Sequence, residues 1–348
     1  MGPRRSLPSE LLLLAPGTPL REGLDRIVLG HTGGLIVMGN NERLQDISTG
    51  GFAIDVPLTA TGLRELAKMD GAIVLSADRS RILAAAVHLS PSADFPTQET
   101  GTRHRTAERV WQQTGIPVVT ASASMGTISL FAGDGRHAVP RPEQLLDVAT
   151  QAIGVLGAHR ERLLDTLEDL TAREVQDNVT LRDLAHVAQR FEMFNRVADE
   201  TTQHISGLGS DGRLVAMQLR DLTEDLAPLA SLLQRDYVPD DSEALVLAGL
   251  ATLDDHELFD IVLVGRALGL SPTLHLDSPL SPKGYRHLAT IPRLPNWVSA
   301  RVVDRFGTLA ALYAASAADL QEVDGVTPPV ALQIREGLGH LADRVLNA

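Results

Sequence analysis

The chain has 348 residues, enough for two or three domains that each bury a core of their own. An apolar share of 44% and a charged share of 22% are typical of a globular protein and argue against disorder. The absence of cysteine excludes disulfides and thiolate metal sites and suits a reducing compartment. No run of eighteen apolar residues is free of charge. We therefore expect a cytoplasmic protein without a membrane span.

The net charge of −13 is unevenly distributed along the chain. Residues 141–280 carry 11 Lys and Arg against 25 Asp and Glu, whereas the flanking segments are nearly balanced. Near the C-terminus, Asp304 alone opposes a group of five cations: Lys283, Arg286, Arg293, Arg301 and Arg305. The overall acidity therefore does not exclude nucleic-acid binding by this last segment.

Residues 1–140 alternate strand-like and helical patterns. Short helical segments are expected to end near residues 28, 69 and 113. Apolar runs bounded by turn residues predict buried strands, in chain order, at 33–39, 73–75, 82–89, 117–120 and 127–131. This pattern predicts an α/β domain with a mixed sheet.

Asp70, Gly71 and Ala72 directly precede the predicted strand at 73–75. Glycine lets a ligand approach the backbone closely, and aspartate supplies a hard oxygen ligand for a divalent cation or a base for a hydroxyl. An Asp-Gly pair is also common in turns that bind nothing. This segment alone therefore leaves both interpretations open.

A dense set of donors follows Gly101, namely Thr102, Arg103, His104, Arg105 and Thr106. The next residues, 107–113, form a plausible helix body that Gly115 ends. The donors would thus occupy the first helical turn, where unpaired N–H groups and a partial positive charge favour phosphate. Taken alone, such a run is also typical of a solvated helix start.

Together, the segments at 68–75 and 100–108 resemble the Asp-Gly-Ala and Arg-His-Arg signatures of the diadenylate cyclase domain. The resemblance implies that two ATP molecules are condensed into cyclic di-AMP with release of two pyrophosphates, and that Mg²⁺ or Mn²⁺ is required. Asp70 would hold the metal. The implied catalytic residues are Asp70, Arg103, His104 and Arg105, and the implied nucleotide contacts are Gly71, Ala72, Leu89, Thr102, Arg103, His104, Arg105 and Thr106. The isolated His31 and His88 are given no role.

Residues 141–280 lose the strand signal and show leucine and phenylalanine stripes at helical spacing. Leu156, Leu163, Leu167 and Leu170 form one such stripe. The stripes would form either a dimerisation seam or a core within one chain, and the second interpretation is the more economical. We predict an all-α middle domain here, with a proline-rich linker at 271–282.

Residues 281–348 are predicted to form a third module with helices at 297–306 and 330–337. The Leu-x-x-Val-x-Gly-Val pattern at 320–326 resembles a helix-hairpin-helix, which implies that the turn residues Gly325, Val326 and Thr327 offer amides to DNA phosphates. Lys283 and Arg293 would add charge. The chain departs from the usual pattern, because Pro328 and Pro329 follow where N–H donors are expected. A module that only packs against its neighbours is the alternative.

The three-part layout, with domains at 1–140, 141–280 and 281–348, resembles the DNA-integrity-scanning branch of the cyclase family. This implies ATP as substrate, branched or damaged DNA as a partner, and a homo-octamer. One alternative is a DNA-binding scaffold whose nucleotide domain is inactive and senses ATP. A nuclease or a general nucleotidyltransferase is a further alternative, with no comparably specific motif in the sequence.

Overall fold

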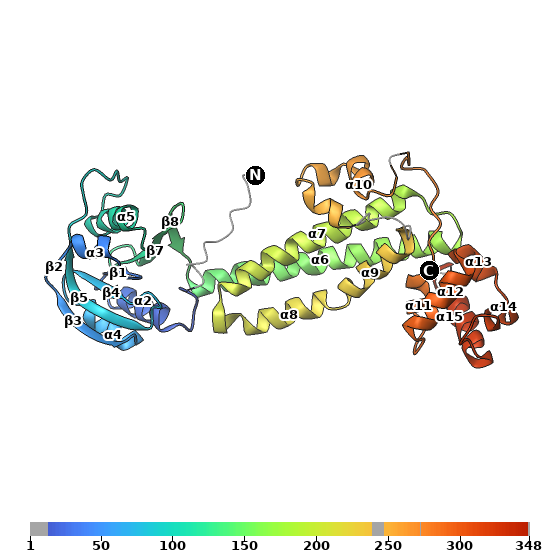
Figure 1. Cartoon of the computed structure of the whole chain (residues 1–348), viewed down its shortest axis with the longest axis horizontal. Coiled ribbons are helices and arrows are strands. Elements are labelled where there is room, and N and C mark those ends of the chain that lie inside the picture. Colours follow the sequence, from blue (N-terminus) through green and yellow to red (C-terminus); the bar gives the residue numbers. More distant parts are fainter. Residues whose placement is uncertain (1–12, 239–246, 272, 347–348) are drawn as a thin grey trace. The chain divides into compact units, whose positions relative to one another are not determined.

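The structure, a computed structural model, describes residues 13–238, 247–271 and 273–346. The chain divides into two compact units. The first unit comprises residues 1–151 and 201–217, and the second comprises residues 152–200 and 218–348. The boundaries at 140 and 280 that composition suggests stay predictions. Figure 1 shows the helices and strands of both units.

The first unit contains an eight-stranded sheet with the order β2-β5-β4-β1-β6-β7-β8, in which β3 also pairs with β5. Strand β1 runs parallel to β4 and antiparallel to β6, and the remaining pairs are antiparallel. The predicted mixed sheet is therefore confirmed. The strands are β1 (Gly34–Val37), β2 (Ser48–Thr49), β3 (Phe52–Pro57), β4 (Ala72–Leu75), β5 (Arg81–Leu89), β6 (Val118–Ser122), β7 (Thr127–Ala132) and β8 (Gly135–Val139).

Different helices cover the two faces of this sheet (Figure 1). On one face, Leu24 and Leu63 pack in the same core as Ile36 of β1. On the other face, Val110 packs in the same core as Val37. Neighbouring residues of β1 thus enter opposite cores, as the period of two in a strand requires. The helices are α2 (Pro19–Leu29) and α4 (Ala60–Leu66) on the first face, and α3 (Glu42–Asp46) and α5 (Thr102–Thr114) on the second.

The sequence patterns did not reveal β2, β3 and β8. Strand β3 is largely exposed, and its Phe52 side chain is 63% exposed, so it shows no buried apolar run. Strand β8 alternates between half-buried and exposed positions. Edge strands of this kind lack the apolar run by which buried strands are recognised.

Helices replace strands after residue 141, as predicted. Buried residues of several helices, among them Leu163, Leu184, Phe191 and Leu233, form one core of the second unit. The leucine stripes therefore pack within one chain. The helices are α6 (Pro142–Val175), α7 (Leu181–Ser206), α8 (Arg213–Thr223), α9 (Leu226–Tyr237) and α10 (Ile261–Ala267), with single 3₁₀ turns at Gly209–Gly212, Ala248–Thr252 and Glu257–Phe259.

The proline-rich segment predicted at 271–282 runs back along the start of α7, as far as the structure describes it. The Leu181 amide donates to the Ser278 carbonyl at 3.0 Å, and the Leu280 amide donates to the Val179 carbonyl at 2.9 Å. These bonds pair its backbone with the residues that precede and begin α7. The segment is thus docked on the helical unit through its main chain.

The last part of the second unit consists of helices around a further apolar core that includes Leu288, Val302, Leu320 and Ile334. The helix predicted at 297–306 is confirmed, and the one predicted at 330–337 belongs to a longer helix. No helix of the described residues is long and apolar enough to span a membrane. The helices are α11 (Tyr285–Ala289), α12 (Asn296–Phe306), α13 (Leu309–Ala314), α14 (Ala317–Gln321) and α15 (Pro328–Leu346).

Candidate functional site

The donor-rich segment begins helix α5, as predicted. Gly101 is the N-cap in extended backbone, the helix covers Thr102–Thr114, and Gly115 ends it with a left-handed φ of 73°. A left-handed residue directly after a helix is the usual place for glycine. The first amides of α5 have no intrahelical acceptor, so the segment presents N–H groups together with its side chains.

The other motif lies at the start of β4, where Gly71 has a φ of +112°. A Cβ atom at this position would lie 2.7 Å from the carbonyl carbon of Ala86 in β5, closer than any side chain tolerates. Glycine is therefore needed here for both its backbone conformation and its size. The preceding Asp70 carboxylate accepts a hydrogen bond from the Gly71 amide at 3.1 Å.

A bulge in β5 lies directly opposite this glycine. Ala72 pairs with Val87, but Val74 pairs with Ala84, so β5 holds one extra residue between the two pairs. Ala86 within the bulge has a φ of +54°, which is uncommon for a residue with a side chain. A bulge re-aims the side chains that follow it, and the next residues, Val87 to Leu89, all line the same pocket.

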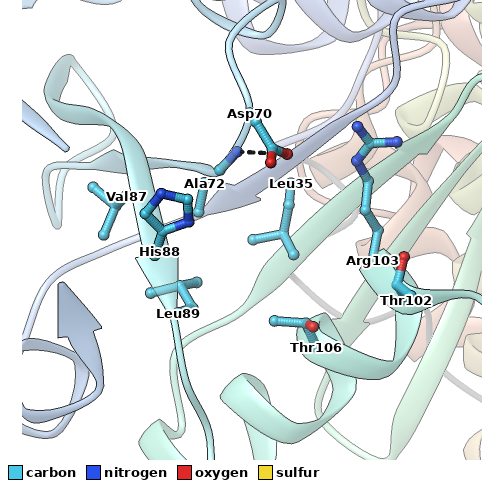
Figure 2. A pocket seen from close by; sticks show the side chains of 10 residues that line it. Leu35, Asp70, Ala72, Val87, His88, Leu89, Thr102, Arg103 and Thr106 are labelled. Carbon is cyan, nitrogen blue, oxygen red and sulfur yellow. Dashed lines mark hydrogen bonds between the residues drawn. The ribbon is translucent and has the colours of Figure 1, made fainter. Parts of the chain in front are cut away.

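The two motifs meet at one pocket of about 180 Å³, which Figure 2 shows. Asp70 and Arg103 lie on different sides of it; Asp70 lies in the bend before β4, and Arg103 belongs to the first turn of α5. The two threonines of the first turns of α5 complete the polar side. The lining residues are Leu35, Asp70, Gly71, Ala72, Val87, His88, Leu89, Thr102, Arg103 and Thr106.

Arg103 is positioned by a second glycine. Gly33, with a φ of +70°, precedes β1, and a Cβ atom there would lie 2.8 Å from Nη1 of Arg103. The guanidinium group therefore lies directly against the Gly33 backbone. It is the one arginine among the lining residues, and Asp70 is the one carboxylate among them. The pocket thus combines one guanidinium cation with one carboxylate.

His104 and Arg105 lie outside the pocket lining. His104 is 6% exposed and packs edge-on against Phe131, with ring centroids 6.2 Å apart. Burial lowers the pKa of His104 below its ordinary value of 6.5, and the nearby Arg136 charge lowers it further. The imidazole is thereby biased toward its neutral form. Arg105 is exposed.

Three lining residues were not among the site residues that the sequence suggests: Leu35, Val87 and His88. They come from strands β1 and β5, which only the sheet brings beside the two motifs. His88 is exposed, and it follows Val87, the first paired residue after the bulge. No pattern within either strand marks these residues, whereas the spacing of His104 with Ala107 and Val110 does mark the buried face of α5.

The residues suggested for DNA binding lie in the last part of the second unit. Nζ of Lys283 donates to the Val238 carbonyl at 3.1 Å. Arg293 is exposed and has a φ of +61°. Gly325, with a φ of +88°, and Thr327 are exposed in the turn before α15, whereas the side chain of Val326 is buried.

Pro328 and Pro329 are the first residues of α15, so the fold of this turn accommodates both. Gly325 lies close to the ring of Trp297, because a Cβ atom there would be 2.5 Å from it. The Arg301 guanidinium lies 5.2 Å from the centre of that ring. Next to the turn there is thus an exposed aromatic residue with a cation over its face.

The fold and the site define a protein with an N-terminal nucleotide-binding domain followed by a helical region. The profile of the DisA bacterial checkpoint controller nucleotide-binding domain matches residues 21–136, and that of the DisA linker region matches residues 140–276. The DNA integrity scanning protein DisA of a Parafrankia species is 47% identical over 338 residues, which cover 96% of this chain and 94% of the relative. The protein of the same name from Cutibacterium acnes is 46% identical, with coverage of 94% and 96%. The chain belongs to the DisA family.

Proposed function

We propose that this chain is a diadenylate cyclase, which condenses two ATP molecules into cyclic di-AMP and releases two pyrophosphates. The observation that carries the proposal is the meeting of two motifs, distant in the sequence, at one pocket: Asp70 with Gly71 from the start of β4, and Arg103 from the start of α5. A carboxylate and a cationic helix start on one cavity provide what a triphosphate and its metal need.

In the proposed reaction, the 3'-hydroxyl of one nucleotide attacks the α-phosphorus of the other. A P–O bond forms, the bond to the β-phosphate breaks, and pyrophosphate leaves. Arg103, the hydroxyls of Thr102 and Thr106, and the first amides of α5 would hold the phosphates and offset their charge. Positioning and charge neutralisation supply most of the catalysis in such transfers.

Asp70 would hold Mg²⁺ or Mn²⁺. It would either accept the proton of the attacking 3'-hydroxyl itself or, through the bound metal, lower the pKa of that hydroxyl. No cluster of three or more potential metal ligands exists among the described residues. The donor set still fits Mg²⁺, because this ion is commonly held by one or two carboxylates together with substrate phosphates. When bound, it would neutralise charge on the departing pyrophosphate.

One pocket of about 180 Å³ with one carboxylate serves one nucleotide, whereas the product joins two. Two copies of the site must therefore face each other, which makes a homo-oligomer part of the proposed mechanism. The family resemblance suggests an octamer built from such pairs.

Incubation of the purified chain with ATP and Mg²⁺, followed by chromatography of the nucleotides, tests the proposal. We expect cyclic di-AMP and pyrophosphate from the unmodified chain. Asp70→Asn should lose nearly all product while ATP binding, measured by calorimetry, persists. The matched control is Asp46→Asn, which changes an exposed carboxylate outside the pocket. Unchanged ATP in the unmodified chain would favour an ATP-sensing scaffold, and full activity of Asp70→Asn would remove Asp70 from the mechanism.

We further propose that the chain scans DNA for branched or damaged sites; its relatives are named DNA integrity scanning proteins. The exposed turn at Gly325, together with Arg293 and Lys283, would contact phosphates without reading bases. We propose that this turn belongs to a helix-hairpin-helix. Because prolines follow at 328 and 329, Thr327 supplies the last amide before α15.

Fluorescence anisotropy with a labelled four-way DNA junction measures this binding. Arg293→Ala should weaken binding and reduce the slope of log affinity against log salt by about 1, because one phosphate contact is lost. Arg220→Ala, at an exposed arginine of α8, is the matched control. Equal salt slopes for the two variants would exclude Arg293 from the DNA contact.

A further inference from the structure

A second pocket, of about 220 Å³, lies within the second unit among helices α6, α9, α11 and α15. The proposed cyclase chemistry does not use it. Its apolar wall includes Leu164, Leu229 and Leu341, and its polar residues include Arg286 and Arg344. A cavity with apolar walls and a few convergent polar groups is the usual form of a small-molecule site.

A buried network holds one side of this pocket in place. The Glu174 carboxylate is fully buried and accepts hydrogen bonds from Nη2 of Arg286, from Nε2 of His287 at 2.7 Å and from the Tyr237 hydroxyl at 2.5 Å. Nη1 of Arg286 donates to the Thr171 hydroxyl at 2.7 Å. These contacts fix the plane of the Arg286 guanidinium before any ligand arrives.

Two guanidinium groups at the pocket have N–H groups that could donate hydrogen bonds to a ligand. Nε of Arg286 is buried and has no hydrogen-bond partner among the residues that the structure describes. Buried donors without partners are rare in folded proteins, and an acceptor supplied by a ligand would satisfy this one. Arg344 lines the same pocket from α15, is exposed, and makes no ion pair within the described part of the chain. Both groups favour an anion.

The charges around the pocket limit that anion to a single negative charge. Glu168 is an exposed carboxylate in the lining, and the buried Glu174 already takes up part of the charge of Arg286. A dianion such as phosphate would be repelled by both, whereas a carboxylate brings one charge and matches a guanidinium in shape. The leucine wall and the small volume then favour a short aliphatic body.

We propose that this pocket binds a small aliphatic monocarboxylate, with its carboxylate between Arg286 and Arg344 and its alkyl chain against the leucines of α6, α9 and α15. Isothermal titration of the full-length chain with hexanoate tests this. We expect saturable binding of hexanoate, and at least tenfold weaker binding of hexan-1-ol, which lacks the charge, and of inorganic phosphate, which lacks the apolar body. Absence of hexanoate binding, or equal binding of hexan-1-ol, overturns the proposal.

Two variants test the site without changing the buried network, and a third serves as their control. Arg344→Leu should weaken hexanoate binding about tenfold, because it removes one charge-assisted hydrogen bond. Glu168→Gln should strengthen it several-fold by removing repulsion. Arg220→Leu, a matched change of an exposed arginine on α8, should leave affinity unchanged. Equal affinity of Arg344→Leu and the unmodified chain would overturn the placement of the carboxylate, and unchanged affinity of Glu168→Gln would overturn the preference for a monoanion.

Discussion

At the scale of single residues, glycines determine where the charged groups of the first pocket lie. Gly71 lets β4 begin in contact with the bulge of β5, and Gly33 makes room for the Arg103 guanidinium. Both have backbone conformations that residues with a Cβ atom rarely adopt. The positions of the Asp70 and Arg103 side chains thus depend on two glycines, which have no side chains of their own.

Replacing Gly71 by alanine should lower the free energy of unfolding of the first unit by more than about 2 kcal/mol, since a left-handed backbone and a close contact combine there. Urea denaturation followed by circular dichroism measures this loss. Gly133→Ala is the control, because Gly133 has a φ of +58° with nothing within 4 Å of an added Cβ atom. It should cost only about 1 kcal/mol. Equal losses would show that the contact with Ala86 contributes nothing.

At the scale of elements, buried acidic side chains join the middle helices to the C-terminal ones. Asp236 at the end of α9 accepts from the amides of Gly284, at 2.8 Å, and Arg286, at 3.0 Å, at the start of α11. Glu174 of α6 contacts Arg286 and His287, which both belong to α11. The segment that composition suggests as a separate module from residue 281 is thus tied to α6 and α9 through buried polar contacts, within one compact unit.

Glu174→Leu should lower the free energy of unfolding of the second unit by about 3–5 kcal/mol, because it leaves the buried Arg286 without its charged partner. The double variant Glu174→Leu with Arg286→Leu should lose less than the sum of the single changes. Urea denaturation of the four proteins forms the cycle. Additive losses would contradict a direct coupling of the two charges.

At the scale of the whole molecule, the proposed reaction needs two copies of the nucleotide pocket, and one chain supplies one of them. Asp70 and Arg103 converge on a pocket from within a single chain, so no residue of a second chain is needed to form it. The second nucleotide, however, must come from a facing copy. Activity would then depend on pairs of intact chains.

Mixing equal amounts of the unmodified chain and Asp70→Asn, after subunit exchange, should leave about one quarter of the undiluted activity, because only pairs with two intact sites close the cyclic product. Cyclic di-AMP formation per total chain is the measurement. Mixing with Asp46→Asn should cause no loss. A remaining activity of one half would indicate that each chain acts alone.

The sequence by itself determined much of the local structure. The strands β1, β4, β5, β6 and β7 follow from apolar runs bounded by turn residues, and the limits of α5 follow from Gly101 and Gly115, because such signals act between near neighbours in the chain. Both motifs of the candidate site were visible for the same reason. The exposed strand β3 and the alternating strand β8 carry no such run, so the sequence does not predict them.

Only the tertiary structure decided which residues share the pocket. The rotation of α5 places Arg103 at the cavity and turns the adjacent His104 into the core against Phe131. The order of the sheet brings Leu35 from β1, and the bulge at Ala86 brings Val87. Strand order and register are set by the packing of all the strands and helices together, so no single stretch of sequence contains them.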